Sequence, residues 1–166
     1  MNTIDEAGIL ALATRLQRLS EKIRAQGTAI YKACGVDFDP KWFPVIYALH
    51  KKKVLSVVEL AQEIGYTHPS TISLLKELTG NRLVRSKKDP ADDRKRLLYL
   101  SPAGLTLVDR MQPVWHLIVQ SITQVTDTRN NLFKAIEEVE ERVDRSAILT
   151  IALNLFHSKE PISKVR

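Results

Sequence analysis

The sequence predicts a mainly helical fold that contains one small β-hairpin. Apolar residues recur at helical spacing through most of the 166 residues, both before and after the middle of the chain. Between residues 82 and 100, two basic segments flank a turn-forming stretch that holds Pro90 and three aspartates. These two observations together favour long helices at both ends and a compact mixed segment between them.

Two short helices joined by a tight turn precede the hairpin. Ser56 and Glu59 form a capping box at the start of the first helix, and Gly65 is placed to end it. Thr67 caps the second helix, and Pro69 occupies its first turn, where a missing amide proton costs nothing. The inward face of the second helix is expected to carry Thr71, Leu74, Leu75 and Leu78.

The other face of this second helix carries short polar groups and one lysine around a helix N-terminus. Such groups can bind phosphate and reach base edges in the major groove. An exposed isoleucine at the same face can pack on a thymine methyl group. The residues expected to contact DNA from this helix are Thr67, His68, Ser70, Ile72, Ser73 and Lys76.

The hairpin adds positive charge to the same part of the chain. Residues 51–100 contain 11 Lys and Arg against 6 Asp and Glu, so nearly all of the net charge of +6 lies there. A basic face without a partner is the ordinary alternative, but here the charge coincides with a helix-turn-helix. We expect phosphate contacts from Lys87, Lys88, Lys95 and Arg96.

With these motifs the chain resembles the MarR family of winged-helix transcriptional regulators. The resemblance covers roughly residues 39–110 and implies that Arg94 enters the minor groove while Asp92 supports the wing. Thr71 and Ile72 depart from the family pattern of an apolar residue followed by Ser or Thr, so the target sequence is not carried over. The resemblance is carried by residues 60–65, 68–70, 76–78, 83–85, 89–90, 92–94 and 100–104.

The segments at both ends of the chain are predicted to form long helices. Residues 4–33 form one predicted helix, whose apolar residues alternate at steps of three and four, as in a helix that packs along another helix. A plain amphipathic helix on its own core is the alternative. A helix is expected from Ala103 to about residue 125, with a kink at Pro113, and a last one from Asp127 or Thr128 through Phe156.

The resemblance implies that these end helices form a homodimer. The predicted organisation is therefore an N-terminal dimerisation helix at 1–38, a winged helix-turn-helix DNA-binding domain at 39–102, and C-terminal helices at 103–166 that complete the dimerisation domain. A composition of 44% hydrophobic and 27% charged residues is ordinary for a globular protein, and no apolar run is long enough to span a membrane. A cytoplasmic protein is expected.

A ligand site is harder to predict. The resemblance implies that a small aromatic effector binds near the junction of the DNA-binding and dimerisation parts, where Trp42, Phe43 and Tyr47 would line a pocket. Aromatic residues at helical spacing are more often part of the core, which is the alternative. Cys34 as an oxidant sensor, and a metal site at one of the scattered histidines, also remain open, but the expected set of metals and cofactors is empty.

Catalysis is not predicted. The sequence has no Gly-rich phosphate loop, no metal-spaced Cys/His cluster and no nucleophile motif. The favoured function is a homodimeric, sequence-specific DNA-binding regulator, a repressor released by a small effector, which binds a pseudo-palindromic operator. The alternatives are a winged helix used for protein contact and a non-catalytic regulatory subunit. The sequence does not choose between repressor and activator, nor does it identify an operator or an effector.

The role assigned to Arg94 gives a first testable prediction. Arg94→Ala should weaken duplex binding more than Lys87→Ala, because an arginine inserted in a narrow minor groove gains more than a lysine beside one phosphate. Fluorescence anisotropy with one duplex at a single salt concentration measures both losses. Equal losses would argue against a special role for Arg94.

Overall fold

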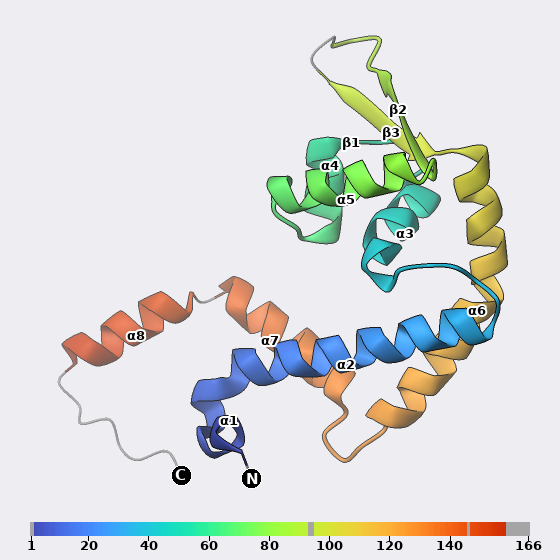
Figure 1. Cartoon of the computed structure of the whole chain (residues 1–166). Coiled ribbons are helices and arrows are strands. Elements are labelled where there is room, and N and C mark those ends of the chain that lie inside the picture. Colours follow the sequence, from blue (N-terminus) through green and yellow to red (C-terminus); the bar gives the residue numbers. More distant parts are fainter. Residues whose placement is uncertain (1, 93–94, 146, 159–166) are drawn as a thin grey trace. The chain divides into compact units, whose positions relative to one another are not determined.

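The computed structural model describes residues 2–92, 95–145 and 147–158. It is mainly helical with one three-stranded antiparallel sheet, which confirms the predicted fold class (Figure 1). The chain divides into two compact units, Met1–Ile118 and Val119–Arg166. None of the helices in the described part of the chain combines the length and apolar character that a bilayer span requires.

The N-terminal segment is broken rather than continuous. A short helix α1 (Thr3–Glu6) is followed by a 3-10 turn η1 (Gly8–Ala11) and the long helix α2 (Leu12–Ala33). The prediction of one helix from residue 4 was wrong at this point, because Gly8 adopts a left-handed conformation with φ +58°. Glycine enters that region at little cost, whereas a right-handed helix cannot pass through it.

The segment between α2 and the next helix contains a capped 3-10 turn. Asp39 accepts a hydrogen bond from the backbone N–H of Lys41 at 3.0 Å and so caps the 3-10 turn η2 (Pro40–Trp42). Helix α3 (Phe43–Lys52) follows directly, with Pro44 in its first turn, where it removes no helical hydrogen bond. The buried residues of α3 are Val45, Ile46, Ala48 and Leu49.

The predicted helix-turn-helix is present with its predicted caps. Helix α4 (Val57–Ile64) begins at Ser56, which forms the full capping box with Glu59, and ends at Gly65, whose φ is +68°. Helix α5 (His68–Gly80) begins at the cap Thr67. Two of the four helix ends in this segment are therefore set by side-chain caps, and a third by the left-handed backbone of a glycine.

The sheet contains one strand that was not predicted. Strands β2 (Val84–Lys88) and β3 (Arg96–Leu100) form the expected hairpin, with Val84 opposite Leu100 and Lys88 opposite Arg96. The two-residue strand β1 (Leu55–Ser56) pairs with the other edge of β3, giving the order β1-β3-β2. We refer to residues 84–100, the β2–β3 hairpin, as the wing.

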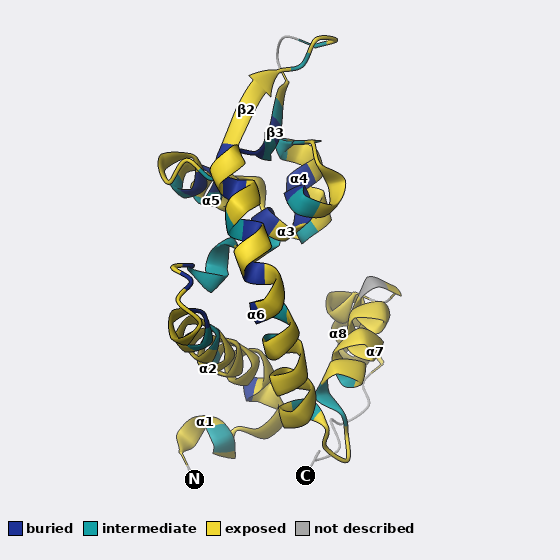
Figure 2. Ribbon diagram, turned by 90° about the vertical axis from the view of Figure 1, so that its right-hand side faces the viewer, coloured by how far each residue is buried: buried dark blue, intermediate teal, exposed yellow. Residues whose placement is uncertain are grey.

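One apolar core joins these elements. It is formed by α3, α4, α5, the sheet and the first half of α6 (Pro102–Thr126) (Figure 2). At the α2–α6 contact, Trp115 Nε1 donates to the hydroxyl of Tyr31 at 3.0 Å, and Arg110 donates to the carbonyl of Gly35 at 2.7 Å. These bonds place the C-terminal end of α2 beside α6 within the first unit.

The C-terminal unit also departs from the prediction. After the last part of α6, this unit contains α7 (Leu132–Arg145) and α8 (Ile148–His157) in place of one continuous helix through Phe156. The cap of α7 is Asn131, which accepts from the backbone N–H of Lys134 at 3.1 Å, so neither Asp127 nor Thr128 begins the helix. Ala147 separates α8 from α7 with an extended backbone at ψ 126°.

A close backbone approach at Gly104 gives a stability prediction. A Cβ atom on Gly104 would lie 2.2 Å from the carbonyl oxygen of Leu83, so Gly104→Ala must push α6 away from the start of the wing. We expect a loss of roughly 3 kcal/mol in the free energy of unfolding, measured by urea denaturation.

Gly80→Ala is the matched control. Gly80 ends α5, and a Cβ there would meet nothing within 4 Å. Its effect should stay below about 1 kcal/mol. Similar losses in the two variants would show that contact with Leu83 is not what requires glycine at position 104.

Candidate nucleic-acid interface

Hydrogen bonds of three hydroxyl groups stabilise the first turn of α5. Thr67 Oγ1 accepts from the backbone N–H of Ser70 at 3.4 Å and donates to Ser70 Oγ at 2.9 Å. Thr71 is fully buried, and its hydroxyl donates back to the carbonyl of Thr67 at 3.1 Å. Because Pro69 has no amide proton and the N–H groups of Ser70 and Thr71 both bond to Thr67, the first turn of α5 is satisfied by its own residues, and its polar side chains are what it offers to a ligand.

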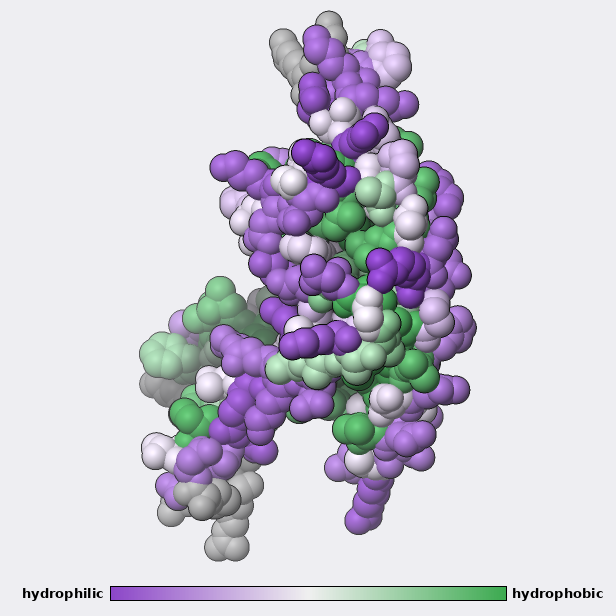
Figure 3. All heavy atoms as spheres, turned by 45° about the vertical axis from the view of Figure 1, so that its right-hand side comes forward, coloured by the Kyte–Doolittle hydropathy of each residue, from purple (hydrophilic) through white to green (hydrophobic). Residues whose placement is uncertain are grey.

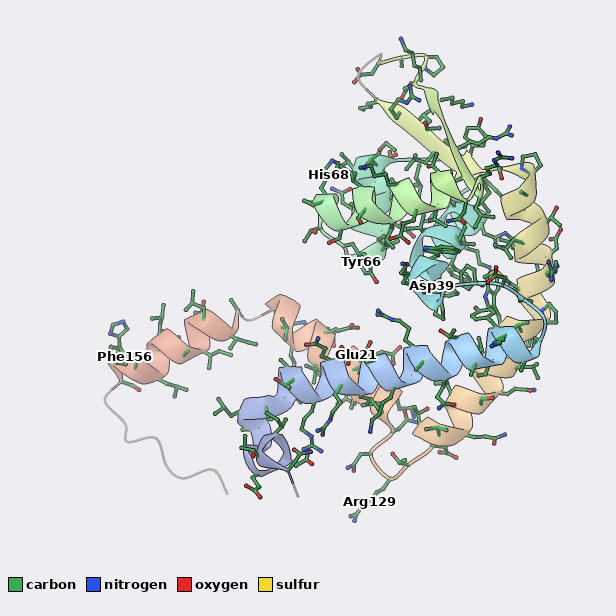
Figure 4. The ribbon with its side chains drawn as sticks, viewed as in Figure 1. Glu21, Asp39, Tyr66, His68, Arg129 and Phe156 are labelled. Atoms are coloured by element: carbon green, nitrogen blue, oxygen red, sulfur yellow. The ribbon has the colours of Figure 1, made fainter. Side chains whose placement is uncertain are left out.

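The two faces of α5 divide as the sequence predicted. Thr71, Leu75 and Leu78 are buried, and they turn the helix so that its other side is open to solvent. Ile72 is 45% exposed on this open side. Figure 4 shows His68 at the start of the helix, on the side away from α2. The six predicted contact residues, Thr67, His68, Ser70, Ile72, Ser73 and Lys76, are all exposed.

The wing presents the second set of predicted residues. Lys87, Lys88, Lys95 and Arg96 are all exposed, and the hairpin is largely hydrophilic in Figure 3. Lys87 and Arg96 have contacts within the wing. Lys87 Nζ lies 6.0 Å from the centre of the Tyr99 ring, and Arg96 donates to Ser86 Oγ at 2.9 Å. Both contacts still leave the charge at the surface.

The tip of the wing is partly described. Asp89 Oδ1 accepts from the backbone N–H of Ala91 at 2.9 Å, and the Asp92 carbonyl accepts from Lys95 N–H at the same distance. These bonds close the turn on both sides of its apex. Arg94, which is predicted to enter the minor groove, lies outside the described residues, and the supporting role of Asp92 stays a prediction.

An unpredicted cluster holds α5 against η2. Glu77 of α5 accepts from Lys41 Nζ at 2.7 Å and from Trp42 Nε1 at 3.0 Å. Lys41 Nζ also lies 3.3 Å from a carboxylate oxygen of Asp39. The Lys41 and Trp42 hydrogen bonds lower the pKa of Glu77 below its ordinary value, and the same contact with Glu77 raises the pKa of Lys41. The groups that join α5 to η2 are therefore charged at neutral pH.

The three aromatic residues predicted to line an effector pocket face different surroundings. Trp42 contacts Phe38 edge-on, with ring centres 5.9 Å apart, and bonds to Glu77. Phe43 and Tyr47 instead stack on each other at 5.1 Å, and both contact the ring of Trp115 edge-on. Phe43 and Tyr47 are half-exposed, so this pair is more accessible to a ligand than Trp42 is. The role of all three residues in ligand binding stays a prediction.

The remaining candidate ligands are scattered. Cys34 is exposed at the C-terminal cap of α2, and His116 Nδ1 lies 2.9 Å from the carbonyl of Gln112 in its own helix. Within residues 2–92, 95–145 and 147–158, no group of three or more His, Cys, Asp or Glu side chains is placed to hold a metal ion.

Comparison with known proteins identifies the central segment. Residues 36–95 match the sequence model of the MarR family. No curated protein matches the chain. The solved structure of a mutant MarR from E. coli complexed with operator DNA is similar, with a TM-score of 0.68 and 18% identity, over 86% of this chain and 99% of that one.

Two further solved structures share the fold. PcaV from Streptomyces coelicolor, in complex with its natural ligand, has a TM-score of 0.64 at 19% identity, over 89% of this chain and 99% of that one. BpsR from Bordetella bronchiseptica, whose DNA binding is regulated by 6-hydroxynicotinic acid, has a TM-score of 0.57 at 22% identity, over 77% and 98%. At these identities the likeness establishes the fold.

The cluster around Glu77 predicts a pH-dependent stability. Because the pKa of Glu77 is lowered in the folded protein, its bonds favour folding above the ordinary value of 4.5 and are lost as the pH falls through the folded-state pKa. Glu77→Gln should therefore unfold at lower urea concentration than the wild type at pH 7, and the difference should vanish in acid.

Glu63→Gln provides the control. It removes a carboxylate that lies 3.7 Å from Lys52 Nζ and should show a smaller difference at pH 7. A difference between wild type and Glu77→Gln that is the same at pH 7 and pH 3 would contradict the assignment of the effect to the ionised carboxylate.

Proposed function

The chain carries a MarR-family winged-helix domain at residues 36–95, and we propose that it is a sequence-specific DNA-binding regulator of transcription that acts as a homodimer. MarR-family proteins are regulatory DNA-binding proteins rather than enzymes. Within that class, we propose a repressor that binds a pseudo-palindromic operator and dissociates from it when a small molecule binds.

The observation that carries the proposal is the shared placement of a polar helix face and a basic wing. Helix α5 offers exposed Ser70, Ser73 and Lys76, and the wing offers exposed lysines and arginine on one compact unit. A helix of this kind can enter the major groove while a hairpin contacts the adjacent backbone or minor groove. The excess of positive charge in residues 51–100 supplies the long-range attraction to phosphate.

Uncovered apolar surface supports the homodimer. On α2, Leu16, Leu19 and Ile23 follow the predicted seam and are 44%, 37% and 40% exposed, although residues at such spacing are usually buried against another helix. The exposed apolar residues of α7 and α8 include Phe133, Ile136, Val139, Val143, Ile148, Leu149, Ile151, Leu153, Leu155 and Phe156.

A second copy of this chain is the proposed cover for these surfaces. A two-fold dimer would present two α5 helices to the same side of a duplex, about one helical turn apart, which requires a pseudo-palindromic operator. The structure of a mutant MarR on operator DNA is compatible with this use of the fold. Dimerisation and DNA binding are therefore linked in the proposal.

The effector part of the proposal draws on the ligand-bound relatives. PcaV was solved with its natural ligand, and 6-hydroxynicotinic acid regulates DNA binding by BpsR. In this chain, a small aromatic ligand at Phe43 and Tyr47 would contact α3 and, through Trp115, α6. A ligand that binds one arrangement of the dimer more tightly shifts the population away from the arrangement that fits DNA.

The proposal is tested by fluorescence anisotropy with the duplex that flanks the chain's own gene and with an unrelated duplex, over a salt series. Preferential binding to the first duplex, with affinity that falls steeply as salt rises, is expected. Weak and equal binding would point to an operator elsewhere. Binding to neither duplex at low salt would favour the protein-contact function instead.

A dimer-deficient variant sharpens the test. Leu16→Glu should convert the dimer to monomer in sedimentation and weaken binding to a full operator by about 100-fold, because the two recognition helices are no longer linked. Thr14→Glu places the same charge on the other side of α2 and should change neither measurement. Monomeric wild-type protein with full operator affinity would overturn the proposed dimer.

A further inference from the structure

A groove separates α2 from the first two turns of the recognition helix α5. It has a volume of about 290 Å³ and belongs to the first unit. Figure 4 shows Tyr66 on the side of α5 that faces α2. The lining residues are Arg24, Lys41, Tyr66, Ser70, Ser73 and Leu74. We refer to this feature as the α2–α5 groove.

The groove is continuous with the face of α5 that is proposed to read DNA. Ser70 and Ser73 line the groove, and both belong to the exposed polar side of the helix. A duplex that contacts this side of α5 therefore also reaches the mouth of the groove. Helix α5 lies between the wing on one side and α2 on the other, so the wing and the groove flank it from opposite sides (Figures 1 and 2).

The charge of the groove is positive. Arg24 and Lys41 line it, and no carboxylate does. The ammonium group of Lys41 already lies 2.7 Å from Glu77 and 3.3 Å from Asp39. In the described part of the chain, by contrast, no carboxylate lies within salt-bridge distance of Arg24. Of the two cations, Arg24 is therefore the one whose charge no described carboxylate balances.

The hydroxyl groups of the groove add neutral donors to this charge. Ser70 Oγ accepts a bond from Thr67 Oγ1 at 2.9 Å, which leaves the proton of Ser70 available to another acceptor. Tyr66 is 39% exposed, and Ser73 is exposed in the next turn of α5. Arginine together with Ser and Tyr hydroxyl groups is a donor set that proteins use to bind the phosphates of DNA.

The position of the groove gives this donor set a use. The major groove is about 12 Å wide, close to the diameter of a helix with its side chains, so a helix that enters it has a phosphate backbone on each side. The cations of the wing are available to the backbone on one side of α5. Arg24 is available to the backbone on the other side, which the predicted wing contacts leave without a partner.

We propose that the α2–α5 groove seats a backbone phosphate of the duplex, with Arg24 as its principal ligand and Tyr66, Ser70 and Ser73 as further donors. The DNA-contacting surface thus extends beyond the winged helix onto α2, the predicted dimerisation helix. This inference rests on the proposed function, because it requires a duplex on α5. A phosphate contact positions the protein without reading bases, so it adds affinity at every sequence.

The salt dependence of duplex binding tests the contact. Each neutralised phosphate adds about 0.9 to the slope of log affinity against log salt concentration. Arg24→Gln removes two contacts from a homodimer, so the slope should fall by about 1.8, and affinity should drop roughly 60-fold at about 0.1 M salt. The loss should be equal on the duplex that flanks the chain's own gene and on an unrelated duplex.

Lys32→Gln is the matched control. Lys32 is another exposed cation of α2, and it does not line the groove. This variant should keep the slope and the affinity of the wild type, and both variants should unfold at the wild-type urea concentration. An unchanged slope in Arg24→Gln would overturn the contact even if affinity fell, since a loss without a change in slope reflects altered packing of α5.

A duplex with one neutral methylphosphonate in place of a phosphate locates the contact. The substitution is moved along the backbone one position at a time. At one position in each half-site the wild type should lose affinity, while Arg24→Gln should lose nothing further. Losses that match in the two proteins at every position would overturn the role of Arg24. A wild type that binds no duplex would remove the proposed function and this inference together, whereas an unchanged Arg24→Gln slope beside normal wild-type binding would remove this inference alone.

Discussion

The start of α6 depends on one buried hydroxyl group. Ser101 is 1% exposed, and its Oγ donates to the carbonyl of Arg82 at 2.6 Å and accepts from the N–H of Gly104 at 3.0 Å. Its backbone N–H donates to the carbonyl of Leu83 at 2.9 Å. A buried polar group of this kind is favourable only when its partners are all in place. The turn after α5, both wing strands and the first turn of α6 are therefore held in one arrangement, and glycine at position 104 lets them approach.

Much of the central segment could be predicted because its signals are local. Ser56 and Glu59 are three residues apart, and Thr67 lies beside the helix that it caps, so the sequence alone identifies both helix starts. The inward face of α5 follows from helical periodicity in the same way. The hairpin was predicted from its basic strands and turn residues, and the MarR resemblance agrees with the match of residues 36–95 to the model of that family.

The features that were missed depend on distant partners or on a single backbone angle. Strand β1 has only two residues and exists because Leu55 meets Leu98, far along the chain. Trp42 and Glu77 are likewise separated by 35 residues, so their hydrogen bond has no local pattern. The break at Gly8 is hidden because apolar residues continue across it, and only its positive φ reveals the interruption. The residue-level DNA contacts remain predictions, since exposure shows that a side chain is accessible and not what it touches.

The pairing of β1 with β3 has a consequence for how an operator is read. Ser56 belongs to β1 and is also the cap of α4, so the hydrogen bonds that hold the base of the wing also fix the start of the helix-turn-helix. In the proposed regulator, the wing and the recognition helix α5 thus keep a fixed spacing along the duplex. That spacing sets the number of base pairs within one half-site. An effector or a mutation in the end helices can instead change the spacing and phase between the two half-sites. Related operators are therefore expected to diverge first in their central spacer.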